Sequence, residues 1–328
     1  MKYPIGIQSF EKLRKERFLY VDKTKYIYEL VDQGVYYFLS RPRRFGKSLL
    51  ISTIEAYFQG KKELFDGLAI KEEEKDWKQY PIFHIDLNTA NFREEGSLYI
   101  LLNDYLDKWE SIYGTRSSEN TLALRFKGII ERAAEKEGRN VVILIDEYDK
   151  PILQTLRNPE LQEKHRNQLK AFYSVLKTQD KYIKFAFITG VTKFGKVSVF
   201  SDLNNLTDIS MDNRYVAICG LTEEELATYF KQGIEELAKT YGDTIEEAIA
   251  KLRERYDGYH FEEHTIGIYN PFSVLNAMSR KQYKDYWFET GTPTFLVDLL
   301  KKHNYRLQNL TTERVSSDVI NSIDSMST

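Results

Sequence analysis

The sequence predicts an α/β fold, in which a doubly wound, mostly parallel sheet is followed by a smaller α-helical domain. Short apolar runs, rich in branched and aromatic residues, alternate with longer segments of helical periodicity, which is typical of βαβ crossovers. Two of these runs, around Val141 and Phe185, are almost continuously apolar, as in strands that helices cover on both faces. After Cys219 the periodicity is only helical.

Each apolar run is five or six residues long, which suits a strand. The predicted strands are residues 35–39, 82–87, 141–145, 183–188 and 215–219. The segments between them predict helices over residues 23–33, 48–59, 98–112, 120–136 and 163–178.

The helical part begins at Gly220-Leu-Thr-Glu-Glu-Glu225, where Thr222 can cap a helix and the acidic residues suit its first turn. Further helices are predicted over residues 223–240, 244–255, 270–280 and 294–303. We therefore expect a sheet-containing core over residues 1–220, a helical lid over residues 221–303, and a polar tail or truncated connection over residues 304–328.

Composition and charge exclude several classes of protein. Of the 328 residues, 42% are hydrophobic, so the chain can bury a globular core. The 47 basic and 49 acidic residues leave a formal charge of −2, so we expect no direct binding of nucleic acid by this chain alone. No apolar stretch approaches the roughly 18 residues of a membrane span. A single cysteine and an N-terminus without an apolar leader predict a cytoplasmic protein.

The sharpest motif is Ser40-Arg-Pro-Arg-Arg-Phe-Gly-Lys-Ser48, here called the phosphate loop (residues 40–48), which follows the first predicted strand and opens a predicted helix. In a P-loop, or Walker A motif, main-chain N–H groups bind the phosphates of a nucleotide, a lysine reaches their outer oxygens and a hydroxyl ligates Mg²⁺. The lysine role falls to Lys47 and the hydroxyl role to Ser48. The predicted nucleotide-binding residues are Arg43, Arg44, Phe45, Gly46, Lys47, Ser48 and Leu49.

The loop is a variant, because the usual pattern has a glycine at the position of Arg41. Arg43 and Arg44 both lie inside the loop, where two cations without a phosphate would repel each other. We therefore expect at least one of them to bind phosphate or to link neighbouring elements.

A second motif follows about 100 residues further along, where Val141-Val-Ile-Leu-Ile-Asp-Glu147 places two acids at the end of an apolar strand. This is the form of a Walker B strand. Asp146 would hold Mg²⁺, and Glu147 would orient and deprotonate the attacking water. A strand that simply ends in a solvated acidic turn is the alternative. Asp149 fits a loop or helix-capping role better than a catalytic one.

Three other features have two interpretations each. Thr189, at the end of the strand 183–188, can help to hold the attacking water, or it can be an ordinary polar residue at a strand end. The cluster of Tyr3, Phe10, Phe18 and Tyr20 can stack on an adenine or pack on the core. His260-Phe-Glu-Glu-His264 matches a zinc-binding helix, although its turn-like surroundings favour a short hairpin.

The chain resembles the AAA-ATPase-like family of bacterial and archaeal P-loop proteins. The likeness rests on the phosphate loop and on Ile143-Leu-Ile-Asp-Glu-Tyr-Asp149, and it extends to Phe18-Leu-Tyr-Val-Asp-Lys-Thr24, Phe187-Ile-Thr-Gly-Val191, Tyr256-Asp-Gly-Tyr259 and Tyr269-Asn-Pro-Phe-Ser-Val-Leu275. It implies an ASCE-type, AAA-like P-loop sheet with a helical lid, and it implies that Arg41 is a habit of the family.

Members of that family often carry a C-terminal PD-(D/E)xK nuclease-like domain. The residues after Leu300 are too few to form one. We therefore expect either a piece of a longer protein or a stand-alone ATPase.

Two functions remain. The first is an ATPase that uses Lys47, Glu147 and Thr189 in catalysis and Ser48 and Asp146 for Mg²⁺, and that drives a protein partner, a second copy of itself or an appended domain. The alternative is a nucleotide-controlled binding module with negligible turnover. ATP is preferred to GTP on the family resemblance, and no N-K-x-D guanine-reading motif occurs. A small-molecule kinase is disfavoured because the Asp-Glu pair suits water better than a second substrate.

Overall fold

The computed structural model describes residues 1–193, 199, 200, 203, 205–261 and 265–286. These residues form two compact units. The first unit contains residues 1–79 and the described residues from 207 to 286, and the second contains the described residues from 80 to 206. The two units are described separately below.

The first unit begins with the helices α1 (Phe10–Lys15) and α2 (Thr24–Gln33), which lead into strand β1 (Tyr36–Ser40). The phosphate loop follows and opens helix α3 (Lys47–Phe58), and a short helix α4 (Ile70–Glu73) lies further along. Strand β5 (Thr207–Asp208) pairs in parallel with β1, with Phe38 opposite Asp208. All of β1 except Ser40 is buried, so the phosphate loop starts from a fixed strand end.

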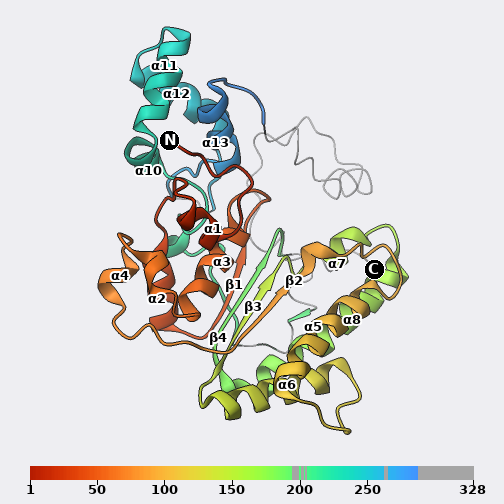
Figure 1. Cartoon of the computed structure of the whole chain (residues 1–328). Coiled ribbons are helices and arrows are strands. Elements are labelled where there is room, and N and C mark those ends of the chain that lie inside the picture. Colours follow the sequence, from red (N-terminus) through yellow and green to blue (C-terminus); the bar gives the residue numbers. More distant parts are fainter. Residues whose placement is uncertain (194–198, 201–202, 204, 262–264, 287–328) are drawn as a thin grey trace. The chain divides into compact units, whose positions relative to one another are not determined.

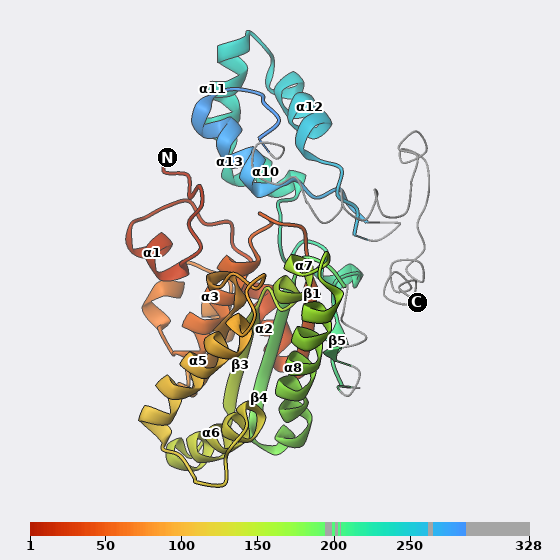
Figure 2. The ribbon, with the colours of Figure 1, turned by 90° about the vertical axis from the view of Figure 1, so that its right-hand side faces the viewer.

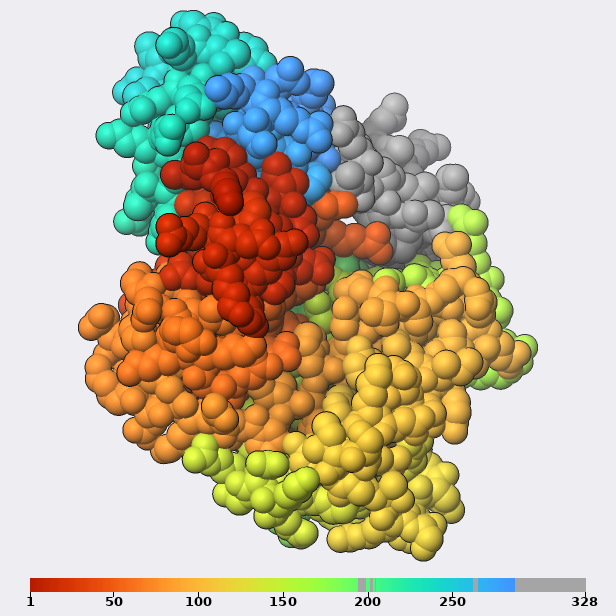
Figure 3. All heavy atoms as spheres, in the orientation of Figure 1, coloured from red at the N-terminus to blue at the C-terminus, as the bar shows by residue number. Residues whose placement is uncertain are grey.

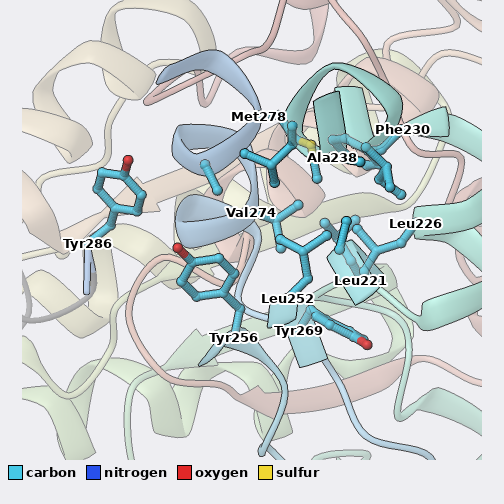
Figure 4. Packing of buried hydrophobic residues seen from close by; sticks show 14 residues of the cluster. Leu221, Leu226, Phe230, Ala238, Leu252, Tyr256, Tyr269, Val274, Met278 and Tyr286 are labelled. Carbon is cyan, nitrogen blue, oxygen red and sulfur yellow. The ribbon is translucent and has the colours of Figure 1, made fainter. Parts of the chain in front are cut away.

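The first unit ends in four helices, here called the lid helices: α10 (Glu223–Tyr229), α11 (Lys231–Tyr241), α12 (Ile245–Tyr256) and α13 (Pro271–Arg280). Thr222 and Thr244 begin α10 and α12 as capping boxes, each satisfying main-chain N–H groups that a helix start leaves unpaired. Buried side chains of these helices form one hydrophobic cluster, here called the lid core. Figure 4 shows its side chains converging, among them Leu226, Phe230 and Val274. The lid helices thus have a hydrophobic core of their own.

The N-terminal residues pack against these helices. The ring of Tyr3 stacks on that of Phe230, with centroids 6.0 Å apart. In the space-filling view the N-terminal residues, in red, adjoin the teal and blue lid helices (Figure 3). Tyr3 and Phe230 are far apart in the sequence, so no local sequence pattern predicts this contact.

The second unit contains strands β2 (Ile82–Asp86), β3 (Val141–Asp146) and β4 (Ile183–Gly190), which pair in parallel in that order. Its helices are α5 (Ser97–Tyr113), α6 (Leu122–Glu137), α7 (Lys150–Gln154) and α8 (Pro159–Thr178). Helix α6 packs against both α5 and α8, and all three run beside the strands (Figure 2). Every residue of β3 is buried, as its unbroken apolar run predicts.

The predicted α/β class is confirmed: within each unit the strands named above pair in parallel, and the fold is consistent with a P-loop NTPase. Four of the five predicted strands are present within two residues of their predicted bounds, and the helices around them are present within four residues. The predicted helix 294–303 and the tail 304–328 lie outside the described residues. Within the described part of the chain, no helix combines the length and the apolar composition that a membrane span requires.

The prediction of a strand over residues 215–219 is wrong. The segment forms turns, although all five residues are buried. The main-chain oxygens of Tyr215 and Val216 accept hydrogen bonds from the guanidinium of Arg41, at 3.2 and 3.5 Å. A distant side chain therefore satisfies polar groups that a strand would pair with a neighbour, and apolar composition alone cannot distinguish the two cases.

The single helix predicted over residues 223–240 is also wrong, because it is two helices, α10 and α11, that meet at Phe230. Phe230 leaves helical geometry, with φ −114° and ψ 11°, and its side chain is only 1% exposed. Both helices contribute to the lid core, α10 with Leu226 and α11 with Ile234 and Leu237.

Candidate functional site

The phosphate loop has the main-chain geometry of an anion site. Gly46, the residue that begins α3, has φ 94°, and Arg44 has φ 68°, so two residues of the loop are left-handed. A Cβ on Gly46 would meet no atom within 4 Å, so glycine is needed there for its backbone conformation and not for space. Left-handed residues before a helix start turn successive N–H groups toward one side, where an anion can bind.

Lys47 lies inside this loop. Its side chain is buried, with 4% exposure, and its Nζ donates to the main-chain oxygens of Arg41 at 3.0 Å and Pro42 at 3.3 Å. Ser48 and Leu49 follow in the first turn of α3 and are half-buried. The ammonium group is thus held at the centre of the loop, where it can exchange a carbonyl oxygen for a phosphate oxygen.

The side chains of the loop separate into two kinds. Arg43 and Arg44 are exposed, and the guanidinium of Arg44 lies 4.1 Å from the ring centroid of Phe272 in α13. Phe45 is 1% exposed, and its ring contacts that of Tyr259 edge to face, with centroids 4.6 Å apart. The arginines are available to a ligand, whereas the Phe45 side chain packs inside the unit and adjoins the cavity beside the loop.

A mainly apolar cavity of about 100 Å³ lies directly beside the loop. Three parts of the first unit contribute to its wall: the loop and α3 (Phe45, Gly46, Leu49), the N-terminal segment (Tyr20, Val21, Lys23) and the lid side (Leu221, Pro271, Leu275). The cavity is large enough for several water molecules or for part of a flat apolar group.

The aromatic N-terminal residues lie in two kinds of surroundings. Phe10 is fully buried and packs against Phe65, with ring centroids 4.9 Å apart. Tyr20 packs on Phe10 and also lines the cavity, and burial raises its pKa. The core interpretation therefore fits Phe10, whereas Tyr20 belongs to the wall beside the loop.

Sequence reasoning missed Lys23, which lies at the cavity wall and forms an ion pair with Glu225 of α10. Its Nζ is 2.5 and 2.6 Å from the two carboxylate oxygens. Burial lowers the pKa of Lys23, while Glu225 opposes that shift. The only local signal was its place in the Phe18–Thr24 segment of the resemblance, because the pairing joins residues 202 positions apart.

In the second unit, the predicted site residues lie at two neighbouring strand ends: Asp146 and Glu147 at β3, and Thr189 at β4. Asp146 is 2% exposed, and the hydroxyl of Thr189 donates to its Oδ1 at 2.5 Å. The N–H of Tyr148 donates to the main-chain oxygen of Thr189 at 2.9 Å. Asp146 and Thr189 thus meet directly. Glu147, between Asp146 and Tyr148, has φ 55°, a left-handed conformation that is rare for residues other than glycine, asparagine and aspartate.

Asp149 organises the segment that follows β4. Its carboxylate is fully buried and accepts from the N–H groups of Val191 and Thr192 and from the Thr192 hydroxyl, at 2.8–3.2 Å. Burial, together with the nearby Glu147, raises the pKa of Asp149 to about 6, although the hydrogen bonds to its carboxylate oppose the shift. The structural role that its sequence context suggested fits this geometry.

The raised pKa of Asp149 predicts a pH-dependent stability. The ordinary value is 3.8, so the folded protein binds this proton more tightly than the unfolded chain does. The contribution to the free energy of unfolding is complete below pH 3.8 and falls as pH rises to about 6, in total by about 3 kcal/mol. The side chain in Asp149→Asn does not titrate. The difference in the free energy of unfolding between wild type and this variant should therefore change by about this amount between pH 4 and 7, as measured by urea unfolding.

Glu135→Gln is the control for this experiment, because Glu135 is an exposed carboxylate on α6 in the same unit. The control should show no comparable change. A difference between wild type and Asp149→Asn that stays constant over the pH range would contradict the buried-carboxylate explanation. Tyr173 is the other titratable group close to Asp149, and its pKa is raised above its ordinary value, outside this range.

The residues predicted for Mg²⁺ suit that ion in type. Mg²⁺ prefers oxygen ligands, keeps several waters and uses only one or two carboxylates, so it needs no cluster of acids. Among the described residues no three histidine, cysteine or acidic side chains lie together as a metal site. For zinc, the required helix is missing at His260, where Tyr259 bridges to Ile268 instead, and His264 lies outside the described residues.

Comparisons with known proteins agree with the motifs. Residues 4–200 match a family described as "Predicted AAA-ATPase". A protein of Azotobacter chroococcum mcd 1, named "Uncharacterized protein in vnfD 5'region", is 41% identical over 301 residues, covering 91% of this chain and 56% of that protein. The chain therefore spans little more than half the length of this relative. With the phosphate loop and the acidic strand end both inside the matched residues, the chain belongs to the AAA-ATPase-like family.

Proposed function

We propose that this protein binds Mg·ATP and hydrolyses it, and that the nucleotide state changes the position of the lid helices. The observation that carries the proposal is the Lys47 ammonium, held by carbonyl oxygens in a loop between a parallel strand and a helix start. Left-handed residues followed by a lysine at a helix start are the arrangement that binds phosphate in a P-loop, so this placement favours an anion site. Membership in the family supports a nucleotide as that anion.

The phosphates would be bound by the main-chain N–H groups before α3 and by Lys47. The exposed guanidinium groups of Arg43 and Arg44 can reach toward the outer phosphates, and Arg44 can leave the Phe272 ring to do so. Ser48 supplies the hydroxyl for the metal ion.

The base would enter the apolar cavity beside Gly46 and Leu49, because a base attached to phosphates at the loop has to lie close to it. Filling the cavity should therefore weaken binding of ATP but not of tripolyphosphate, which has no base. In Leu275→Trp we expect the dissociation constant of ATP to rise about tenfold, as overpacking costs about 1–3 kcal/mol, and that of tripolyphosphate to stay unchanged. Calorimetric titration with both ligands measures this.

Leu124→Trp is the control, because Leu124 is an exposed residue of α6, outside the cavity. If Leu275→Trp weakened both ligands equally, the cavity would not be the base site.

Hydrolysis would depend on the acidic strand ends. Asp146 would supply a carboxylate oxygen to Mg²⁺, and the ion would neutralise charge on the phosphates. Glu147 would orient and deprotonate the attacking water, and Thr189 would support that arrangement through its hydrogen bond to Asp146. A guanidinium from a second copy or from a protein partner could supply further charge, as in other P-loop enzymes.

The experiment is to measure ATP binding and phosphate release by the whole chain, with and without Mg²⁺, at low and high protein concentration. Binding with Mg²⁺-dependent release supports the ATPase. Binding without release at any concentration would replace it by the alternative, a nucleotide-controlled binding module. Absence of binding would show that the Arg41 loop is degenerate and that the proposal is wrong.

A further inference from the structure

Arg41 stands where the usual P-loop pattern has glycine, and its side chain is buried, with 1% exposure. Its guanidinium donates to the main-chain oxygens of Ser210, Tyr215 and Val216, at 2.7, 3.2 and 3.5 Å. The same group lies 3.9 Å from the ring centroid of Phe261. A residue whose position in the motif predicts only a tight turn thus makes long-range contacts.

These contacts reach the segment that leads into the lid helices and a segment that joins two of them. Ser210, Tyr215 and Val216 belong to the outgoing segment (residues 209–220), which runs from β5 to α10. Phe261 belongs to the return segment (described residues 257–261 and 265–269), which runs from α12 to α13. Arg41 therefore joins the phosphate loop to the chain on either side of the helices α10 to α12.

Phe45 repeats this connection at the other end of the loop. Its main-chain oxygen accepts from the N–H of Gly220 at 3.1 Å, and its ring contacts those of Tyr259 and Phe261. Leu221, which directly follows the outgoing segment, forms an antiparallel bridge with Tyr269 of the return segment. The loop thus contacts both segments at two points.

The main chain of Arg41 connects this arrangement to the phosphate site. Lys47 Nζ donates to the main-chain oxygen of Arg41, while the Arg41 side chain binds the outgoing segment. The guanidinium remains charged at neutral pH, although burial lowers its pKa to about 10. Its hydrogen-bond acceptors in the described part of the chain are main-chain oxygens, and its Nε has none there. Such a group is held only while these oxygens keep their positions.

We infer that Arg41 is a positioning residue that transmits the occupancy of the phosphate loop to the lid helices. When an anion takes the Lys47 ammonium, the Arg41 carbonyl loses a hydrogen bond, and the shift of the loop passes through the guanidinium to the outgoing segment and through Phe261 to the return segment. The ligand class is any polyphosphate that fits the loop, with or without a base. The inference rests on the proposed function, since it requires the loop to bind an anion.

The test is amide hydrogen exchange over residues 209–220 and 265–278 of the whole chain, with and without saturating tripolyphosphate or Mg·ATP. In the wild type we expect either ligand to change the amide exchange rates of residues 209–220 and of residues 265–278 at least about threefold. In Phe261→Ala we expect tripolyphosphate to bind within about threefold of the wild type, while the response of residues 265–278 is lost. A purely structural role of Phe261 would alter the basal exchange rates but leave the ligand-dependent change intact.

Substitution of Arg41 itself completes the test. Arg41→Gly restores the usual pattern, yet we expect it to lose the response of both segments, and Arg41→Lys should keep only part of it because an ammonium cannot span three acceptors in one plane. If the Arg41 variants fail to fold, Phe261→Ala decides. A full response in Phe261→Ala would overturn the inference alone, whereas a wild type that binds neither ligand would overturn the proposed function as well.

Discussion

Lys47→Ala should abolish detectable nucleotide binding. The Nζ of Lys47 donates to two carbonyl oxygens of the loop, and a phosphate can replace these acceptors. Charge-assisted hydrogen bonds contribute about 1.5–3 kcal/mol each, so the loss of two should raise the dissociation constant about a hundredfold or more. Calorimetric titration with Mg·ATP and with tripolyphosphate measures the effect, and both ligands should be affected alike.

The matched control is Lys25→Ala. Lys25 is a lysine of the same unit with a side chain 75% exposed, so its loss should leave binding unchanged. Because Lys47 also donates to two carbonyl oxygens of the loop, its variant should be compared with the wild type at a temperature at which both proteins are folded. Retained binding in Lys47→Ala would show that the anion does not occupy this loop.

Glu147→Gln should separate binding from chemistry. Glutamine keeps the shape of the side chain but cannot accept a proton from water, and loss of a general base lowers rates by about 10²–10⁴. The rate of phosphate release should therefore fall by that factor, while the dissociation constant of Mg·ATP stays within about threefold of the wild type. Steady-state phosphate release and calorimetric titration provide the two readouts.

Glu135→Gln serves as the control, as an exposed residue of α6 in the same unit. Equal turnover of wild type and Glu147→Gln would remove Glu147 from the mechanism. A parallel loss of binding would instead indicate that this carboxylate supports the fold of the strand end, because the main chain there is already in a rare conformation.

The parts of the molecule that the sequence predicts are those governed by local patterns. The run Val141–Asp146 is apolar on both faces, so it could only be a buried strand, and the acid at its end follows from the same run. The start of α3 is equally local, since Gly46 supplies the left-handed residue that a loop needs before a helix.

What the sequence could not predict depends on contacts between distant residues. The segment 215–219 has the composition of a strand, but Arg41 satisfies the main-chain oxygens of two of its residues, and no property of the segment itself reveals this. The pair of Lys23 and Glu225 is hidden for the same reason, because each residue alone resembles an ordinary surface charge. The cavity arises from three separate parts of the chain and has no local sequence signal.

The left-handed conformation of Glu147 has a consequence for how this protein can be stabilised. Glycine would adopt the φ of 55° without strain, whereas a longer side chain loses about 1 kcal/mol or more there. Replacement by glycine is therefore an obvious choice for anyone who seeks a more heat-resistant form, and the proposed role of Glu147 means that the choice would sacrifice turnover. At this position the proposed mechanism sets turnover against stability, and the chain carries the residue that the proposed mechanism requires.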